Sequence, residues 1–395
     1  MKAASLYIHI AFCISKCAYC DFFSVAQEGK IPDEYINALC NEIAARGAEA
    51  SVTSLKTIYI GGGTPSLLNS QQLQKIFNQI RKSFLLDEDC EISVEVNPDD
   101  VNLLLLESLS SCGVNRISCG IQSLSDAALK KACRRADSAT CRKALELLKN
   151  KWRGQLSLDL ISALPEESES SFLSGLEEII SFKPSHISMY SLTIEENTPF
   201  GKMLSRGQLS YDYDKADQLW LSGRDLLESK GYKWYEVSNF CLTGKECRHN
   251  LSYWKHESYL GCGSGGCGTI YDEDGSGFRW TNTTEIKKYI DFWTSDKLPY
   301  KVTEAPCVNE RIELETSKFE FFMMGLRKLS GVSEAEYKSV FNEPFPSWFL
   351  QPFREWEEKG LCRFIAKGET EGGEGRYAMS RQGILFLNTF LEKLI

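Results

Sequence analysis

The chain has 395 residues, a formal net charge of −9 and a pI near 5.3. Its length allows two or three domains with a sizeable core. The acidic balance argues against nucleic acid as the main partner, because binding a phosphate backbone needs clustered Lys and Arg. No segment approaches the roughly 20 apolar residues that span a bilayer, and no secretion signal is visible, so we expect a cytoplasmic protein.

Residues 5–240 repeat a short apolar strand, a polar turn and an amphipathic helix. The strands look buried rather than cleanly alternating, which is typical of a parallel sheet. Strand–helix alternation at this spacing builds βαβ units, so the pattern predicts an α/β fold with a full or partial β/α barrel. The predicted strands are Leu6–Ile10, Thr57–Ile60, Ile92–Val96, Arg116–Ile121, Leu156–Ile161 and Ile187–Leu192, with a seventh candidate at Trp234–Val237. The predicted helices include Asp33–Ala50, Gln71–Phe84, Val101–Cys112, Ala139–Lys149 and Ser170–Phe182.

The remaining chain divides into two parts. Residues 241–303 are rich in Gly, Tyr and Trp, contain the sequence HNLSYW (His249–Trp254), and read as a linker region of loops and short strands. Residues 304–395 read as a smaller, mainly helical, winged-helix-like domain, for which packing or docking is favoured over DNA binding by the acidic charge. Its predicted elements are helices at Phe319–Leu329, Glu334–Phe341 and Phe353–Lys359, extended pieces at Leu361–Ile365 and Arg376–Met379 around a Gly-rich turn, and a final helix to Ile395.

Three of the 15 cysteines, Cys13, Cys17 and Cys20, follow the first strand in the sequence FCISKCAYCDF. From the cysteine frequency, this spacing would arise by chance about 0.02 times in a chain of this length. Thiolates ligate iron–sulfur clusters, and three of them leave one iron of a four-iron cubane open. A zinc site is the alternative, but it needs a fourth ligand, and no Cys or His occurs in the next 19 residues. Without an export signal, a disulfide framework is not expected.

The spacing C-x3-C-x2-C, followed by GGGTP after the second strand, resembles the radical S-adenosylmethionine (SAM) superfamily. The motifs YIHIAFC, CAYCDF, GGGTPS, EVNP, NRISCGIQS, LDLISALP and HNLSYW are similar to those of its oxygen-independent coproporphyrinogen III oxidase-like branch, and most of all to the HemW family of haem chaperones. The resemblance runs from about residue 5 to the C-terminus. It implies a partial (β/α)6-type radical SAM barrel, a [4Fe–4S] cluster on Cys13, Cys17 and Cys20, and SAM as a second cofactor.

The resemblance also implies a set of SAM-binding residues. Glu95, Gln122 and Asp159 are polar side chains at the ends of apolar strands, where burial without partners would cost several kcal/mol and where β/α barrels place their active sites. Taken singly, each residue has an ordinary alternative: a structural glycine turn, a salt-bridged carboxylate or, for Arg134, a solvated helix-end charge. The joint pattern favours a site. The implied residues are Tyr7, Tyr19, Gly62, Gly63, Thr64, Glu95, Gln122, Arg134, Asp159 and Thr193.

Two function classes compete, with a different radical SAM reaction as a third. The resemblance implies that coproporphyrinogen decarboxylases carry the motif C-x3-C-x2-C-x-C and a long extension before the cysteines. Here Phe22 stands where the fourth cysteine would be, and Cys13 lies near the start of the chain. Haem binding and delivery is therefore favoured. The resemblance implies a haem or porphyrin ligand and a haem-accepting partner protein; it leaves open whether the acceptor is membrane-associated, whether the chain forms a homodimer, and whether SAM is turned over.

The resemblance also bears on the haem ligand. Its motif makes His249 the candidate axial ligand, and the alternative is a hydrogen bond that tethers its loop. His9 is expected to be packed or to support a neighbouring ligand, and His186 and His256 are expected to have no role in ligand binding. The sequence departs from the family at Ala11, where a proline is usual, at Cys267, where a histidine is frequent and a thiolate could ligate iron instead, and in RRADSAT, which lacks a usual histidine.

Overall fold

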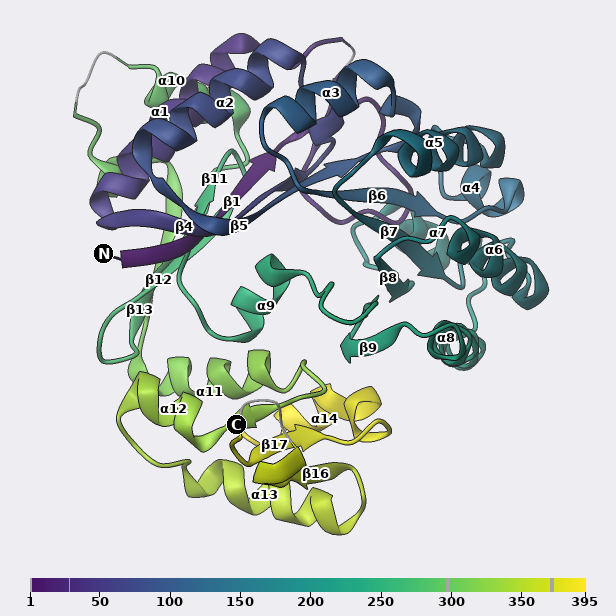
Figure 1. The fold of residues 1–395 in the computed structure, drawn as a ribbon, viewed down its shortest axis with the longest axis vertical. Coiled ribbons are helices and arrows are strands. Elements are labelled where there is room, and N and C mark those ends of the chain that lie inside the picture. The colour runs from purple at the N-terminus through teal and green to yellow at the C-terminus, as the bar shows by residue number, and fades with distance from the viewer. Residues whose placement is uncertain (1, 28, 296–298, 370–372) are drawn as a thin grey trace.

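The computed structural model describes residues 2–27, 29–295, 299–369 and 373–395. Twelve strands in this part of the chain form one curved sheet, in the order β14-β13-β12-β11-β1-β4-β5-β6-β7-β8-β10-β9 (Figure 1). The strands in chain order are β1 (Lys2–Ile10), β4 (Val52–Gly62), β5 (Leu85–Val96), β6 (Arg116–Gln122), β7 (Gln155–Ser162), β8 (His186–Ser191), β9 (Lys233–Glu236), β10 (Asn239–Cys241), β11 (Tyr259–Cys262), β12 (Cys267–Tyr271), β13 (Gly277–Asn282) and β14 (Cys307–Ile312).

The six predicted strands of the β/α series form the parallel centre of the sheet. Each of β1, β4, β5, β6 and β7 pairs in parallel with the next strand of that series, ending at β8. The sheet does not close, since β14 and β9 are its edges. The prediction of a partial barrel is therefore confirmed.

Helices cover the convex face of this sheet, and one helix lies on its concave side (Figure 1). Local sequence fixes several helix starts; for example, Asn69 and Gln72 form a reciprocal capping box at the first turn of α2. The concave side holds α9 (Arg248–Trp254). The helices of the barrel are α1 (Asp33–Glu49), α2 (Ser70–Ser83), α3 (Leu103–Ser111), α4 (Asp126–Lys131), α5 (Ser138–Lys151), α6 (Glu169–Ser181), α7 (Pro199–Ser205), α8 (Tyr213–Ser229) and α10 (Ile286–Trp293).

The parallel strands are buried at most consecutive positions, which agrees with the prediction, but their two faces differ in chemical character. In β1, Leu6 and Ile8 are fully buried in the main hydrophobic core, whereas the ring of Tyr7 lies beside that of Tyr59 of β4, with 6.4 Å between centroids. Successive side chains of a strand point to opposite faces. The convex face is therefore apolar and the concave face polar, lined by Ser, Tyr, His, Glu and Asp side chains.

Both edges of the sheet depart from the predicted barrel. A strand forms at the predicted seventh position, but β9 lies at the edge of the sheet beside β10, and both β9–β10 and β10–β8 are antiparallel. It is therefore not a further βα unit. At the other edge, β11 pairs in parallel with β1, and β12 and β13 continue the sheet. Part of the segment 241–303 is thus continuous with the barrel sheet; the three-part domain division stays a prediction.

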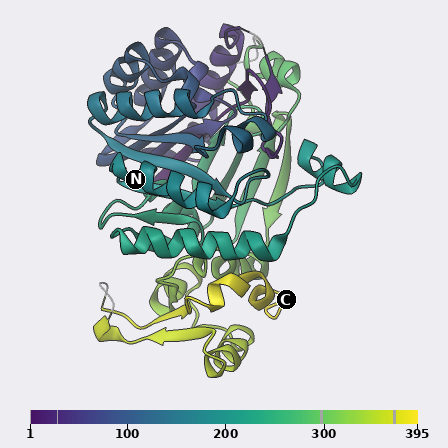
Figure 2. The same cartoon turned by 90° about the vertical axis from the view of Figure 1, so that its right-hand side faces the viewer.

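The C-terminal region forms a separate layer below the sheet (Figure 2). The predicted hairpin is confirmed as β16 and β17, which join β15 in a three-stranded antiparallel sheet; residues 370–372 of its turn lie outside the described residues. The final helix was predicted to reach Ile395 but ends at Leu391, and a 3-10 turn precedes it. The elements are α11 (Leu314–Gly325), β15 (Val332–Ser333), α12 (Glu334–Phe341), α13 (Ser347–Glu358), β16 (Cys362–Ile365), β17 (Arg376–Met379), the 3-10 turn Gly383–Phe386 and α14 (Leu387–Leu391).

Two helices of this region begin earlier than predicted. α11 begins at Leu314 rather than Phe319, and α13 begins at Ser347 rather than Phe353, with Pro352 inside it. Pro352 is the sixth residue of α13, so it removes one backbone hydrogen bond inside the helix, which nevertheless continues to Glu358. In the described part of the chain, no helix combines the length and apolar character needed to cross a membrane.

Candidate cofactor site

The three motif cysteines lie in the loop that follows β1, and all three are free and half-buried. The backbone of Ala18, between Cys17 and Cys20, donates to the carbonyl of Ala132 after α4 and accepts from the N–H of Phe200 in α7, both at 2.9 Å. Burial raises the pKa of the Cys20 thiol, and the nearby Cys17 and Cys13 thiols raise it further. The three thiols therefore share one anchored recess, as the cluster prediction requires.

Each of two cysteine sulfurs has a hydrogen-bond donor from another element. The hydroxyl of Thr64 donates to Sγ of Cys13 at 3.3 Å, and the guanidinium of Arg134 donates to Sγ of Cys17 at 3.5 Å. Such donors favour the thiolate form, which is the form that ligates metals. Two residues predicted from the resemblance thus contact the cysteine loop directly.

Within the described residues, no group of three or more His, Cys, Asp or Glu side chains is placed to hold a single metal ion. The choice of a cubane over zinc therefore stays a prediction, which rests on the cysteine spacing and on the lack of a fourth Cys or His nearby in the sequence.

The glycine turn after β4 passes directly beside the cysteine loop. Gly62 has φ of +105°, and a Cβ there would lie 2.6 Å from the His9 ring. At Gly63 a Cβ would lie 2.6 Å from the carbonyl oxygen of Phe12. Only glycine fits this close approach, which leaves a strip of backbone uncovered between the cysteine loop and β5.

A carboxylate closes the other side of this strip. Glu95, at the end of β5, accepts hydrogen bonds from the Tyr59 hydroxyl at 2.8 Å and from the Gly62 N–H at 3.2 Å. Burial raises the pKa of Glu95 to about 7, and the charge of Asp159 acts in the same direction, while the bond from Tyr59 lowers it. A cationic ligand beside Glu95 would favour its charged form.

Arg134 is built into the site and is not a solvated helix-end charge. One terminal nitrogen donates to the carbonyl oxygen of Gly120 at 2.6 Å and to Oδ1 of Asn97 at 3.1 Å. Its Nε is buried without a hydrogen-bond partner. The amide of Gln122, a residue with φ of 68°, lies on the same side of Gly120. Arg134 thus links β6, the residue that follows β5 and the cysteine loop by hydrogen bonds, and its Nε–H is a donor that these bonds do not use.

Asp159 lies across the concave face from Glu95. The hydroxyl of Ser118 donates to both of its carboxylate oxygens at 2.9 Å. Burial raises the pKa of Asp159, and hydrogen bonds from Ser188 and Ser118 oppose that rise. Serines from the two neighbouring strands therefore hold this carboxylate at the centre of the sheet.

The other predicted residues, Tyr7, Tyr19 and Thr193, differ in whether they contact the cysteine loop. The Tyr7 hydroxyl is 2.9 Å from Nδ1 of His9, whose Nε2 is 2.8 Å from the carbonyl oxygen of Phe23 after the cysteines. Tyr19 packs against a small apolar cluster beside the cysteine loop. Thr193 is exposed after β8, and within the described residues no hydrogen bond links it to the other predicted residues.

His249 is held at both ring nitrogens inside the barrel. Nδ1 is 2.7 Å from Oγ1 of Thr57, and Nε2 is 2.8 Å from the hydroxyl of Tyr253. Its ring stacks on Tyr59 with 5.1 Å between centroids. It is only 1% exposed, and burial lowers its pKa to about 3. This is the tethering arrangement; haem ligation by His249 stays a prediction that would require one of these hydrogen bonds to break.

The other three histidines are packed in the protein interior. His186 lies between Ser157 and Tyr235, with its two ring nitrogens 2.8 and 2.9 Å from their hydroxyls. His256 stacks on Tyr271 with 3.8 Å between centroids. His9, 5% exposed, fastens the cysteine loop to β1 through the contacts given above.

Comparisons with known proteins agree with this geometry. The model of the Radical SAM superfamily matches residues 7–179. The haem chaperone HemW of Escherichia coli (strain K12) is 34% identical over 390 residues, covering 98% of this chain and 97% of that protein. The HemW of Bacillus subtilis (strain 168) is 34% identical over 363 residues, covering 91% and 92%. The chain belongs to the HemW family of radical SAM proteins.

A solved structure shows the same fold. Coproporphyrinogen III oxidase (HemN) from Escherichia coli, a radical SAM enzyme, superposes with a TM-score of 0.81, covering 100% of this chain and 90% of that one, at 20% sequence identity. At this identity the likeness concerns the fold alone. It extends over the C-terminal region as well as the barrel.

Membership of the radical SAM superfamily implies a [4Fe–4S] cluster and SAM, and the residues present fit both. Cys13, Cys17 and Cys20 supply three thiols. The uncovered glycine strip and the unpartnered Nε of Arg134 lie next to them, with Glu95 opposite as a countercharge. These are polar groups that a ligand with amino and carboxylate functions can satisfy.

Two residues of the site were missed by the sequence reasoning. Tyr59 joins Glu95 to His249, and Asn97 joins Thr64 to Arg134, since its Nδ2 donates to Oγ1 of Thr64 at 3.3 Å. Asn97 belongs to the EVNP motif at the end of β5, which could have identified it. Tyr59 lies on the concave face of β4. The alternation of polar and apolar residues in that strand is the sequence signal that could have identified it.

Proposed function

We propose that this chain is a cytoplasmic haem chaperone that binds a [4Fe–4S] cluster, SAM and haem, and delivers haem to an acceptor protein. One observation carries the proposal: 34% identity over nearly the whole length of proteins named haem chaperones. The arrangement of thiols, glycine strip and carboxylates supports the two cofactors. A membrane-associated acceptor and a homodimeric assembly are further parts of this proposal.

In this proposal Cys13, Cys17 and Cys20 hold the cluster, while the Gly62–Gly63 backbone, Glu95 and Arg134 orient SAM. When bound, the reduced cluster can supply the electron that cleaves a carbon–sulfur bond of SAM. The chain's own contribution is position and charge. Glu95 would balance the sulfonium, and Asp159 would accept hydrogen bonds from ribose hydroxyls.

Coproporphyrinogen oxidation is the less favoured reading. In the decarboxylase motif C-x3-C-x2-C-x-C, a fourth cysteine stands two residues after the third. In this chain the corresponding position holds Phe22, which is 71% exposed. An exposed phenyl ring offers no ligand at this position and no polar contact to a propionate. The HemN fold alone does not restore that activity, because folds host many functions and the site decides.

The haem ligand within this proposal remains to be assigned by experiment. Cys267 at the start of β12 is half-buried and accepts a hydrogen bond from the Tyr259 hydroxyl at 3.8 Å. Its thiol has fewer contacts than the ring of His249, so it is the readier of the two to bind iron.

Haem titration of the anaerobically reconstituted chain tests the proposal. We expect a saturable Soret band, and we expect Cys17→Ala to retain it while losing the cluster, because haem and cluster use different residues. Incubation with coproporphyrinogen, SAM and a strong reductant should form no protoporphyrinogen. Absence of a saturable Soret change, or formation of protoporphyrinogen, would contradict the proposal. Measuring 5′-deoxyadenosine with and without haem shows whether SAM is consumed.

A further inference from the structure

A cavity of about 600 Å³ opens at the amino-terminal edge of β5–β8, the end of the barrel opposite the cysteines. Its wall combines the ends of α5 and α6, the loop before α9 and the first residues of β7. The volume lies within the roughly 300–1,000 Å³ typical of small-molecule sites. Active sites of β/α barrels lie at the other end, so this cavity is separate from the cofactor site.

The wall of this cavity carries an excess of positive charge. Two of its residues are acidic, Asp89 and Glu91, and five are basic: Lys149, Arg153, Lys183, Lys245 and Arg248. The chain as a whole has a net charge of −9. A concave cluster of one sign within a surface of the other sign focuses potential and attracts ions of opposite charge.

Most of these cations are not neutralised within the chain. Arg248 pairs with Asp89 at 2.8 Å. Both oxygens of Glu91 are already used, because they accept the N–H groups of Arg248 and His249 at 3.1 and 2.9 Å. In the described part of the chain, none of the other four cations has a carboxylate within 4.0 Å. Lys149 instead lies over the ring of Phe182, 5.3 Å from its centroid.

Helix dipoles explain only part of this cluster. Lysines are favoured near helix C-termini, which accounts for Lys149 in the last turn of α5 and Lys183 just after α6. Arg153 lies beyond the end of α5, and Lys245 comes from the separate loop between β10 and α9. Cations from three segments distant in sequence thus converge on one cavity.

The wall also indicates the kind of ligand. Its apolar side chains, Leu148, Trp152, Leu156 and Phe182, are only 1–8% exposed, so they offer little surface to the broad face of a porphyrin. What remains accessible is cationic and polar. We propose that this cavity binds a compact polyanion, a small molecule with two or more adjacent phosphate or carboxylate groups. Such a ligand would lie against the first turn of α9.

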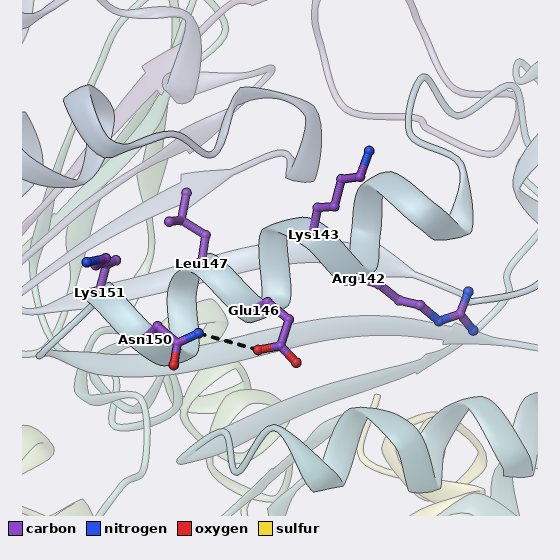
Figure 3. A pocket seen from close by; sticks show the side chains of 6 residues that line it. All are labelled: Arg142, Lys143, Glu146, Leu147, Asn150 and Lys151. Carbon is purple, nitrogen blue, oxygen red and sulfur yellow. Dashed lines mark hydrogen bonds between the residues drawn. The ribbon is translucent and has the colours of Figure 1, made fainter.

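A second hollow on α5 provides the contrast. Its lining comes from a single helix, and apart from the hydrogen bond from Asn150 to Glu146 its side chains point away from one another (Figure 3). Arg142, in that lining, is bound to both oxygens of Glu178 at 2.6 and 2.9 Å. Lys143 of this helix does not line the cavity at the barrel end, so it is a matched control cation.

Calorimetric titration of the full chain with pyrophosphate, citrate and ATP, at about 50 mM salt to limit screening, tests the proposal. We expect saturable binding of at least one probe, weakened at least tenfold in the double variant Arg153→Gln/Lys183→Gln and changed less than twofold in Lys143→Gln. These side chains are exposed, so unchanged thermal unfolding serves as the folding control. Preference for pyrophosphate or ATP assigns phosphate groups, and preference for citrate assigns carboxylates.

Four outcomes would overturn the proposal. The first is no binding of any probe at about 1 mM, where even weak sites of millimolar Kd bind measurably. The second is equal affinity in the wild type and the double variant, and the third is equal weakening in Lys143→Gln. The fourth is displacement of the bound probe by stoichiometric haem, which would assign the cavity to porphyrin. None of these results bears on cluster assembly or SAM binding at the opposite end.

Discussion

Replacing Tyr59 with Phe should make SAM binding strongly pH-dependent above neutrality. The Tyr59 hydroxyl donates to Glu95 at 2.8 Å and lowers the pKa of Glu95, which lies at about 7. A hydrogen bond to a charged group contributes about 1.5–3 kcal/mol, and about 1.4 kcal/mol corresponds to one pKa unit. Without that hydroxyl, the pKa of Glu95 should rise to about 8.5.

The size of the effect follows from the fraction of Glu95 that is ionised. SAM carries positive charge, so we expect it to bind the carboxylate form, with affinity rising as pH passes the pKa of Glu95. At about pH 7.5 the ionised fraction falls from about three quarters to about one tenth when the pKa rises from about 7 to about 8.5. SAM should therefore bind about eightfold more weakly to Tyr59→Phe at that pH, with equal affinities above about pH 10.

Equilibrium dialysis of labelled SAM against the anaerobically reconstituted chain, over a series of pH values, measures this profile. Tyr232→Phe is the control, because the Tyr232 hydroxyl is also buried but donates to the carbonyl of Pro184, away from the site, at 2.6 Å. The control should follow the wild-type curve. If Tyr59→Phe also follows that curve, the contact with Glu95 has no influence on SAM, and the reasoning fails.

Three further predictions concern other parts of the molecule. Cys17→Ala should abolish the broad absorbance near 400 nm of the reconstituted cluster; full iron content with that absorbance retained would refute its role as a ligand. His249→Gln should weaken SAM binding, since it removes the stacked partner of Tyr59, and should leave the Soret band in place; a shifted Soret band would favour haem ligation instead. Glu236 is 1% exposed with one oxygen unpartnered, and burial raises its pKa from 4.5 to about 7. The folded state therefore keeps this proton to higher pH than the unfolded state, and the free energy of unfolding of the wild type falls as pH rises through this range. In denaturant unfolding, Glu236→Gln should gain up to about 3 kcal/mol of stability relative to the wild type at pH 8.5 compared with pH 5. A pH-independent difference between the two proteins would contradict this.

The parallel strands could be predicted because their convex faces carry an unmistakable apolar signal. The predicted strand Arg116–Ile121 ends within one residue of β6. The polar lining of the concave face could not be predicted, because small polar residues such as Ser93 and Ser118 are buried in these strands together with the apolar ones. Their alternation has meaning only when the strands stand side by side and form a polar inner wall.

The helix α9 was missed for a different reason. Its segment reads as loop, and its first turn is capped by a residue that local sequence cannot reveal: the N–H of His249 donates to Glu91, 158 positions earlier in the chain. Carboxylates stabilise helix N-termini, but this one comes from β5. The contact of His249 with Tyr59 also joins residues far apart in the sequence, so local sequence could not predict it.

These long-range contacts give the HNLSYW segment a role that needs no contact with haem. Glu91 fixes the start of α9, α9 places His249 on Tyr59, and Tyr59 holds the carboxylate of Glu95 beside the glycine strip. We expect a change at any of these points to affect Glu95, because the contacts are buried and each residue positions the next one. Loss of function on changing His249 would therefore not by itself identify it as an iron ligand; only a measurement that separates SAM affinity from the haem spectrum can do so.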